Sequence, residues 1–132
     1  MIIVTPEEQV GTAGKAGSRF TGDAYAYLTC TADGTTINTV SFTPGARTHW
    51  HAHESGQILQ VVAGRGLIQS DGGPIEVLRA GSVVWVPAGE RHWHGAAPDA
   101  FMTHTAISLG VTSWHEPVAE LEYHNPDQEE HA

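Results

Sequence analysis

Short strand-like runs, separated by glycine and proline, dominate this sequence. Fifteen glycines and seven prolines are spread along 132 residues. Alternation of apolar and polar residues recurs roughly every eight to twelve positions, and helical periodicity is almost absent. Such a chain buries its apolar residues in packed or closed sheets. The pattern predicts an all-β sandwich or barrel, and the length predicts a single domain over residues 1–132.

The predicted strands follow from that alternation. We expect strands at residues 24–31, 36–42, 47–53, 57–63, 67–70, 75–78, 82–86, 91–95 and 102–109. The glycines of segment 64–66 predict a tight turn between two of them. We also expect a short opening strand at 1–4, a loop or covering segment at 5–23, and a helical turn or edge strand at 117–123. The polar, acidic residues 125–132 are expected to form a disordered tail.

The balance of charges excludes several classes of partner. Acidic residues number 15 against 6 basic residues, which gives a formal net charge of −9. No basic patch is available for a phosphate backbone, so we expect no nucleic-acid partner. The sequence has neither a run of about 18 apolar residues nor a basic N-terminal region, so we expect no membrane span and no secretion signal. These features predict a soluble cytoplasmic protein.

Histidines cluster at strand spacing in the middle of the chain. His49, His51 and His53 occupy alternate positions, and His92 and His94 repeat that spacing in a second strand. Side chains two positions apart share one face of a strand. A lone histidine in a strand is usually an ordinary surface or core residue, but a cluster of matching parity is better explained by a metal ion. The pattern predicts one metal site built from two separated strands.

Two motifs around these histidines resemble those of the cupin family. The first cupin motif has the spacing found here at Gly45, His51, His53, Gln57 and Gly64. The second has the spacing found at Gly81, Pro87, Gly89 and His92. The resemblance covers about residues 36–109. It implies a jelly-roll β-barrel whose metal ligands are His51, His53, Gln57 and His92.

A narrower resemblance concerns the ligand positions themselves. Gln57 stands where cupins usually have Glu, and the Asn that commonly follows the last ligand, His92, is absent. In both features the sequence resembles the small bacterial manganese-dependent hydroxynitrile lyases and their single-domain relatives. The segments at 45–53, 56–57, 89–98 and 102–104 also resemble the sequences of that group. Two positions depart from that group, because His49 is usually a small residue and Ser108 is often Gln. These departures concern a pocket wall and a hydrogen-bonding group, so they bear on the substrate.

The implied ligands predict the character of the metal. Three neutral imidazoles and a carboxamide leave a divalent ion its full charge, which makes it a stronger Lewis acid. Four protein ligands leave two positions open on a six-coordinate ion. We therefore expect one divalent transition metal per chain, with manganese preferred and iron, nickel or zinc as alternatives.

Strand parity also assigns the side chains beside the implied ligands. His94 shares the face of His92, and His104 shares its face with Ser108. If these faces line the barrel, His94 and His104 are uncoordinated bases beside the metal; the alternative is that they orient the ligands. Trp50 and Trp93 point the opposite way and are expected to pack in a core. Arg47, near a turn, is expected at the surface or at an interface.

Two classes of function remain open at this stage. In the first, the chain is an enzyme acting on a small organic molecule, such as a hydroxynitrile-lyase-like carbon–carbon lyase in which His94 or His104 deprotonates a substrate hydroxyl on the metal. Related reactions are decarboxylation, isomerisation and dioxygen chemistry. In the second, the barrel is a metal-anchored binding module or sensor. Histidines beyond the ligand set favour the enzyme, because a sensor needs no proton-transfer groups.

We also expect a homodimer or larger homo-oligomer. Small single-domain cupins usually assemble in this way. Residues 1–4 are apolar and have the composition of a strand that pairs across an interface.

Overall fold

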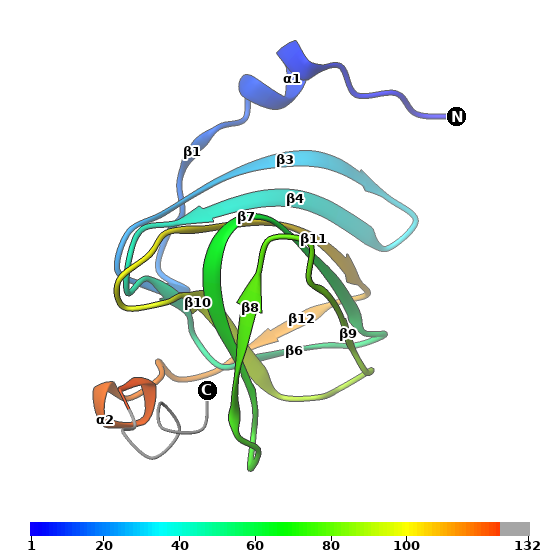
Figure 1. Cartoon of the computed structure of the whole chain (residues 1–132). Coiled ribbons are helices and arrows are strands. Elements are labelled where there is room, and N and C mark those ends of the chain that lie inside the picture. The colour runs from blue at the N-terminus through cyan, green and yellow to red at the C-terminus, as the bar shows by residue number, and fades with distance from the viewer. Residues whose placement is uncertain (125–132) are drawn as a thin grey trace.

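The strands curl into a barrel made of two sheets that share one long strand, β7 (Figure 1). The structure is a computed structural model and describes residues 1–124. The tail at 125–132, expected to be disordered, lies outside the described residues. The elements in chain order are α1 Pro6–Val10, β1 Gly14–Lys15, β2 Phe20–Thr21, β3 Ala24–Ala32, β4 Thr35–Phe42, β5 Arg47–Thr48, β6 His51–His53, β7 Gln57–Ser70, β8 Ile75–Arg79, β9 Val83–Val86, β10 His92–Ala96, β11 Met102–Leu109, β12 Thr112–Trp114 and α2 Glu120–Tyr123.

Both sheets are antiparallel, and neighbours in them come from distant parts of the sequence. The first sheet runs β1-β3-β4-β11-β7-β9 and uses the first half of β7. The second half of β7 pairs with β8 on one side and with β10 on the other. The far edge of β10 pairs with β5 and β6, which in turn pair with β2 and β12. Pairings such as β4 with β11 are those of a jelly roll, so the predicted all-β jelly-roll barrel is confirmed.

Most predicted strands agree with the structure to within a residue, but the turn predicted at 64–66 is wrong. β7 runs unbroken from Gln57 to Ser70. Gly64 has a φ of +83°, close to the point where the register of β7 against β11 shifts. A Cβ on Gly66 would overlap the Met102 sulfur and lie 2.5 Å from the carbonyl oxygen of Gly95. These glycines allow a long strand to bend and pack closely between both sheets.

Apolar side chains form two separate clusters. One fills the interior between the sheets and includes Phe42, Leu59 and Met102, each of them fully buried. The other lies on the outer face of the second sheet and consists of Trp50, Leu67, Ile75, Trp93, Val118 and Tyr123. The expectation that both tryptophans pack in a core is confirmed. The second cluster exists because the segment carrying α2 folds back over β10 (Figure 1).

Arg47 belongs to this covered face, so the prediction that it lies at the surface is wrong. Its side chain is 3% exposed. It donates to the carbonyl oxygen of Val118 at 3.1 Å and to Glu120 Oε1 at 2.8 Å, and its guanidinium lies 4.2 Å from the ring centre of Tyr123. A charge is tolerated there because the returning segment supplies the acceptors and the ring.

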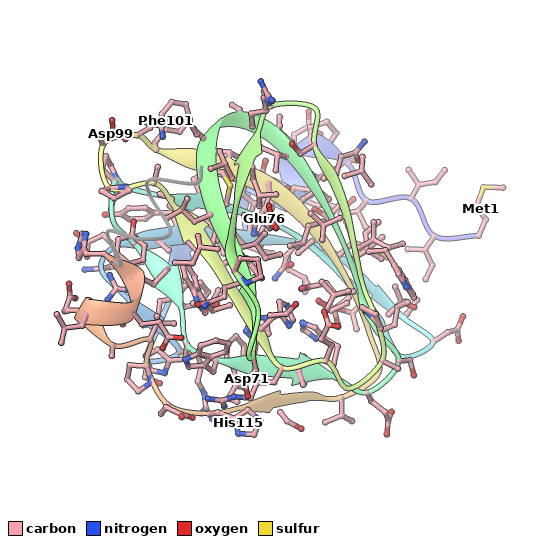
Figure 2. All side chains as sticks on the ribbon, turned by 60° about the horizontal axis from the view of Figure 1, so that its bottom comes forward. Met1, Asp71, Glu76, Asp99, Phe101 and His115 are labelled. Atoms are coloured by element: carbon pink, nitrogen blue, oxygen red, sulfur yellow. The ribbon has the colours of Figure 1, made fainter. Side chains whose placement is uncertain are left out.

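The N-terminal region also differs from expectation. Residues 1–4 form no strand, and Thr5 caps the short helix α1 by accepting a hydrogen bond from the backbone nitrogen of Glu8 at 3.2 Å. The segment expected to be a loop contains α1, β1 and β2. Ile2 and Ile3 are exposed, and Figure 2 shows Met1 standing away from the barrel. Within residues 1–124, neither helix is long or apolar enough to cross a membrane.

The close contacts at Gly66 generate a prediction about stability. Gly66→Ala should lower the free energy of unfolding by about 1–3 kcal/mol, because β7, β10 and β11 must separate to admit the new methyl group. Gly14→Ala is the matched control, since a Cβ there meets nothing within 4 Å. Urea unfolding of the two variants and the wild type measures the difference. Equal unfolding free energies for both variants would contradict this account of β7.

Candidate metal centre

Two histidines of the site come from β6, where a break in the predicted strand decides which rings face inward. β5 ends at Thr48 and β6 begins at His51. Between them the backbone leaves the sheet, because the nitrogens of His49 and Trp50 donate to the carbonyl oxygens of Arg19 and Glu116. His49 is therefore partly exposed and does not line the cavity beside the site. The expectation that three imidazoles share one face is wrong for His49.

The third histidine comes from β10, which pairs with β6 so that His92 lies opposite His51. His51, His53 and His92 are all buried, and each offers a ring nitrogen within 4.8 Å of the others. The ring centres are 4.2 Å apart for His51 and His92, and 5.0 Å apart for His51 and His53. Two separated strands thus contribute to one group that could hold a metal ion.

The outer nitrogen of each ring is held by a hydrogen bond. His51 Nδ1 donates to the carbonyl oxygen of His49 at 2.9 Å, and His92 Nδ1 donates to that of Glu90 at 2.9 Å. His53 Nδ1 lies 2.9 Å from Thr112 Oγ1. A neutral imidazole has one N–H, so the bonds of His51 and His92 leave their Nε2 lone pairs free for a metal ion. His53 has the same free lone pair when its Nδ1 donates to Thr112. Metal-ligating histidines are commonly oriented in this way.

Gln57 adds an oxygen to the same point. Its Nε2 donates to Ser108 Oγ at 3.1 Å, which turns its carbonyl oxygen toward His92 Nε2 at 3.0 Å. With the N–H of His92 already used on Glu90, two lone pairs face each other. A cation placed between the two lone pairs removes this repulsion. Without a cation, the expected arrangement is the opposite one, in which the carboxamide is turned over and its NH₂ group faces His92. The donor set of three imidazoles and one carboxamide therefore fits a divalent transition metal.

Burial keeps the three rings neutral. It lowers the pKa of His51 well below the ordinary value, with the nearby His92 as the next cause. Burial, followed by the charge of His92, lowers the pKa of His53 to about 4. The pKa of His92 is lowered chiefly by burial. At neutral pH all three nitrogens are free to coordinate, and no carboxylate belongs to this group within residues 1–124.

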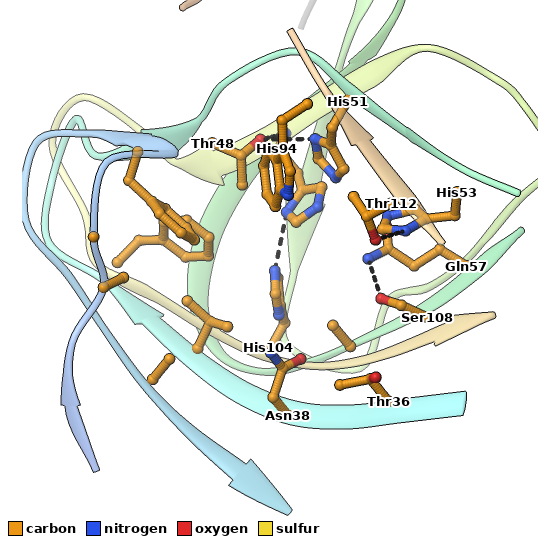
Figure 3. Close-up of a pocket in the computed structure, with 18 of the residues that line it drawn as sticks. Thr36, Asn38, Thr48, His51, His53, Gln57, His94, His104, Ser108 and Thr112 are labelled. Atoms are coloured by element: carbon orange, nitrogen blue, oxygen red, sulfur yellow. Dashed lines mark hydrogen bonds between the residues drawn. The ribbon is translucent and has the colours of Figure 1, made fainter. Parts of the chain in front are cut away.

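Two further histidines lie beside the group and are hydrogen-bonded to each other. His104 Nε2 is 3.0 Å from His94 Nδ1 (Figure 3). The ring of His94 stacks on His92 with centres 5.5 Å apart and lies 5.2 Å from His51. In the described part of the chain, His94 Nε2 and His104 Nδ1 are buried without a hydrogen-bond partner. The pair therefore has two unused nitrogens, and its His94 ring lies against the three-histidine group.

This pair is also neutral and can move a proton. Burial lowers the pKa of His94 well below its ordinary value and lowers the pKa of His104 to about 4. Whichever ring donates the hydrogen bond between them, the other accepts it. When His94 takes up a proton at Nε2, it can therefore release the proton on its own Nδ1 to His104.

A cavity of about 330 Å³ is lined by His51, His53, His94 and His104 (Figure 3). Part of its lining is apolar, with Phe20, Phe42 and Trp114 among the largest side chains. Polar groups line another part, where Asn38 and Thr36 lie below His104 in Figure 3 and Ser108 lies to its right. Within the described residues the lining includes no Lys, Arg, Asp or Glu. The site is suited to a small, uncharged molecule with both apolar and polar parts.

Sequence reasoning missed the contribution of β12 to this site. Thr112 holds His53, and the ring of Trp114 stacks on His51 with centres 4.8 Å apart. Both residues reach the site because β12 pairs with β6. A strand of three residues gives no periodic signal, and only the alternation of threonine and tryptophan in the segment 112–114 could have indicated it.

The low pKa values predict how stability depends on pH. In metal-free protein the folded His53 and His104 have pKa values of about 4, whereas their ordinary value is 6.5. Between these values the unfolded chain binds protons that the folded chain does not. The contribution of these two groups to the free energy of unfolding is therefore largest above about pH 6.5. For each group, the free energy of unfolding falls by about 1.4 kcal/mol per pH unit as the pH drops from there toward 4.

Urea unfolding at a series of pH values tests this dependence. His104→Gln should give a shallower fall in unfolding free energy than the wild type, because one buried titrating group is removed. His115→Gln is the matched control, since His115 is exposed. A fall of equal steepness in the His104 variant and the wild type would contradict the assignment.

Comparison with known proteins gives the family of the chain. A family model described as the cupin domain matches residues 38–105. An (R)-mandelonitrile lyase from Granulicella tundricola is 49% identical over 88 residues, which cover 64% of this chain and 67% of that protein. A cupin-like protein from Thermotoga maritima is 41% identical, with a TM-score of 0.81 over 85% of this chain and 91% of that one.

More distant structures share the fold alone. A predicted oxalate decarboxylase from Thermotoga maritima has a TM-score of 0.71 at 17% identity, over 83% of this chain and 100% of that one. The family match, the identity to the lyase and the barrel lead to the same conclusion. The chain belongs to the cupin family.

Proposed function

We propose that the chain is a metal-dependent lyase that cleaves a cyanohydrin into an aldehyde or ketone and hydrogen cyanide. The observation that carries the proposal is the buried, hydrogen-bonded pair His94 and His104, whose His94 ring lies against the three-histidine group with its Nε2 unused. The 49% identity to an (R)-mandelonitrile lyase supports the same class of reaction.

The residues that would hold the metal are His51, His53, His92 and Gln57. A divalent ion bound by them supplies a Lewis acid for a substrate hydroxyl. Manganese is the ion we propose, because the carboxamide oxygen suits a harder ion and four ligands leave two positions open on a six-coordinate metal. Ser108 keeps that oxygen directed at the site by accepting from Gln57 Nε2.

The cavity would bind the rest of the substrate. Phe20, Phe42 and Trp114 offer an apolar surface for an aromatic or aliphatic group. A volume of about 330 Å³ lies at the lower end for ligand pockets and suits a molecule of this size.

His94 would take the proton of the substrate hydroxyl at Nε2 while its Nδ1 proton moves to His104 Nε2. The carbon–carbon bond to the nitrile then breaks, and its electron pair leaves with cyanide. Return of the proton from the histidine pair to cyanide gives hydrogen cyanide. Atoms and charge balance, and the pair ends as it began, neutral.

The cavity favours this reaction over the alternatives. The described lining offers no Lys or Arg, so a carboxylate substrate would have the metal as its only charge partner, whereas an uncharged hydroxynitrile needs none. A binding module or sensor has no use for a hydrogen-bonded pair of uncoordinated bases. An uncharged hydroxynitrile agrees with both features.

The ligand assignment predicts the metal content of variants. Wild type loaded with manganese and dialysed should hold one ion per chain, and the His51→Ala, His53→Ala double variant should hold much less. His94→Ala, which removes a histidine outside the assigned ligand set, should retain the ion. Metal analysis and the rise in melting temperature on adding manganese measure this. Undiminished binding by a folded double variant would reject the assignment.

The proton-transfer roles predict the kinetics. His94→Ala and His104→Ala should each lower the turnover of mandelonitrile by about 10²–10⁴-fold, the usual contribution of general acid–base catalysis, while metal content is unchanged. His115→Ala, at an exposed position, is the control. Release of benzaldehyde from metal-loaded protein is the assay.

Two outcomes would contradict the proposal. If metal-loaded wild type releases no aldehyde or ketone from mandelonitrile or from aliphatic cyanohydrins, the lyase function is rejected. If cleavage occurs but neither histidine variant slows it, the pair only supports the ligands.

A further inference from the structure

A second cavity lies where the two sheets part, and its volume is about 250 Å³. β9 pairs with the first half of β7 and β8 pairs with the second half, so β8 and β9 diverge from the turn that joins them (Figure 1). Residues of these three strands and of the segment that leads into β10 line the cavity, among them Ile68, Glu76, Val84 and Glu90. We call it the second cavity, and the cavity described above the first cavity.

The three-histidine group lies between the linings of the two cavities. His51 and His53 line the first cavity, whereas His92 lines the second. The ring centres of His51 and His92 are nevertheless 4.2 Å apart. No residue that lines one cavity also lines the other. The group can therefore be approached from two separate cavities.

The two cavities differ in charge. The described lining of the first contains no charged residue, whereas Glu76 and Glu90 line the second without any Lys or Arg. Neither of these carboxylates forms an ion pair in the described part of the chain. Arg91, which follows Glu90, is paired with Asp71 and Glu116 instead. The second cavity therefore keeps uncompensated negative charge, which favours a cation.

Burial increases along the lining of the second cavity. Glu76 is exposed, Glu90 is partly buried and His92 is fully buried. Glu90 is held at two points, because its Oε2 accepts from Ser70 Oγ at 2.8 Å and its backbone carbonyl accepts from His92 Nδ1 at 2.9 Å. His92 therefore has no proton on Nε2, which faces the Gln57 oxygen at 3.0 Å. The series runs from solvent to two facing lone pairs, a place that a cation would stabilise.

We propose that the second cavity is the route by which the metal ion enters the site. The proposal rests on the ligand assignment made for the proposed function. Glu76 attracts the hydrated ion at the surface, and Glu90 draws it on toward His92. Within the described residues these three side chains do not converge into a further group that could hold an ion. The carboxylates therefore attract the ion without retaining it.

The first cavity is less suited to this task. A hydrated divalent ion entering there would pass the rings of Phe20, Phe42 and Trp114 and meet no charged side chain in the described lining. The cost of removing water from the ion would have no compensation along such a path. The same lining suits an uncharged substrate, so the two cavities divide the traffic by charge.

The rate at which metal-free protein takes up manganese tests the route. The Glu76→Gln, Glu90→Gln double variant should take up the ion about tenfold more slowly than the wild type at low ionic strength, which is the lower end of the range for electrostatic steering. Glutamine at position 90 keeps an oxygen for Ser70. The difference should shrink as salt is added, because salt screens exposed charges. The final content should remain one ion per chain, because neither carboxylate is an assigned ligand.

A matched control removes two charges near the first cavity. The Asp33→Asn, Glu54→Gln double variant changes the net charge by the same amount, and both positions are exposed. Gly110 lines the first cavity, and a Cβ there would meet Glu54 Oε1. The nitrogen of Gly110 donates to the carbonyl oxygen of Gly34, which follows Asp33. The control should take up manganese at the rate of the wild type.

The loss of the EPR signal of hydrated manganese after rapid mixing gives the rate, and metal analysis gives the final content. Circular dichroism confirms folding. If the double variant of the second cavity fails to fold, Glu76→Lys replaces it, because the exposed position accepts the opposite charge and should slow uptake to a similar extent.

The outcomes that overturn the proposal are distinct from failure of the proposed function. Equal rates for the second-cavity variant and the wild type, or a control as slow as that variant, reject the route and leave the ligand assignment intact. A final content below one ion per chain in the second-cavity variant makes the carboxylates part of the site and also rejects the route. A folded wild type that takes up no manganese rejects the ligand assignment and the route together.

Discussion

The candidate site depends on one constraint: lone pairs of several neutral groups must converge in a buried place. His51 and His92 meet it by the same local device, in which Nδ1 donates to the carbonyl oxygen two residues earlier. That oxygen is free because β6 and β10 each begin at the histidine, so the preceding residues are outside the sheet. The bend at His49 and the turn before His92 are therefore part of the site, since a continuous strand would commit those carbonyls to a neighbouring strand.

The same constraint explains which parts of the site could be predicted from the sequence. Parity within a strand indicated two histidine clusters on two strands, and alternation indicated an all-β sandwich or barrel. The resemblance to cupins implied the jelly roll and the choice of His51, His53 and His92 among the histidines. The prediction from parity that His49 faces inward was wrong, because the hydrogen bonds that interrupt the strand there come from residues distant in sequence. The glycines at 64 and 66 wrongly predict a turn, because close packing and tight turns use the same residue. Arg47 was misplaced because its burial depends on a segment that returns from the end of the chain.

The two sheets of the barrel differ in what lies over their outer sides. Over the second sheet, Arg47 and Tyr123 tie the returning segment down through backbone carbonyls, so that cover includes buried polar groups with partners. The first sheet has no returning segment in the described residues and keeps uncharged side chains instead. This division leaves the cavity accessible, because its lining comes from the inner faces of both sheets and from β12.

Neutrality of the histidines also constrains the chemistry that the site can perform. A ring with a pKa of about 4, such as His104, is a weak base, so removal of a hydroxyl proton is unfavourable unless that hydroxyl has been made more acidic. The converse step is favourable, because the protonated pair is a far stronger acid than hydrogen cyanide. In the proposed reaction the burial of His94 and His104 therefore hinders proton uptake and promotes proton return. A divalent ion held by the three imidazoles and Gln57 would supply that acidity, and Gln57 in place of Glu would leave the charge of the ion undiminished.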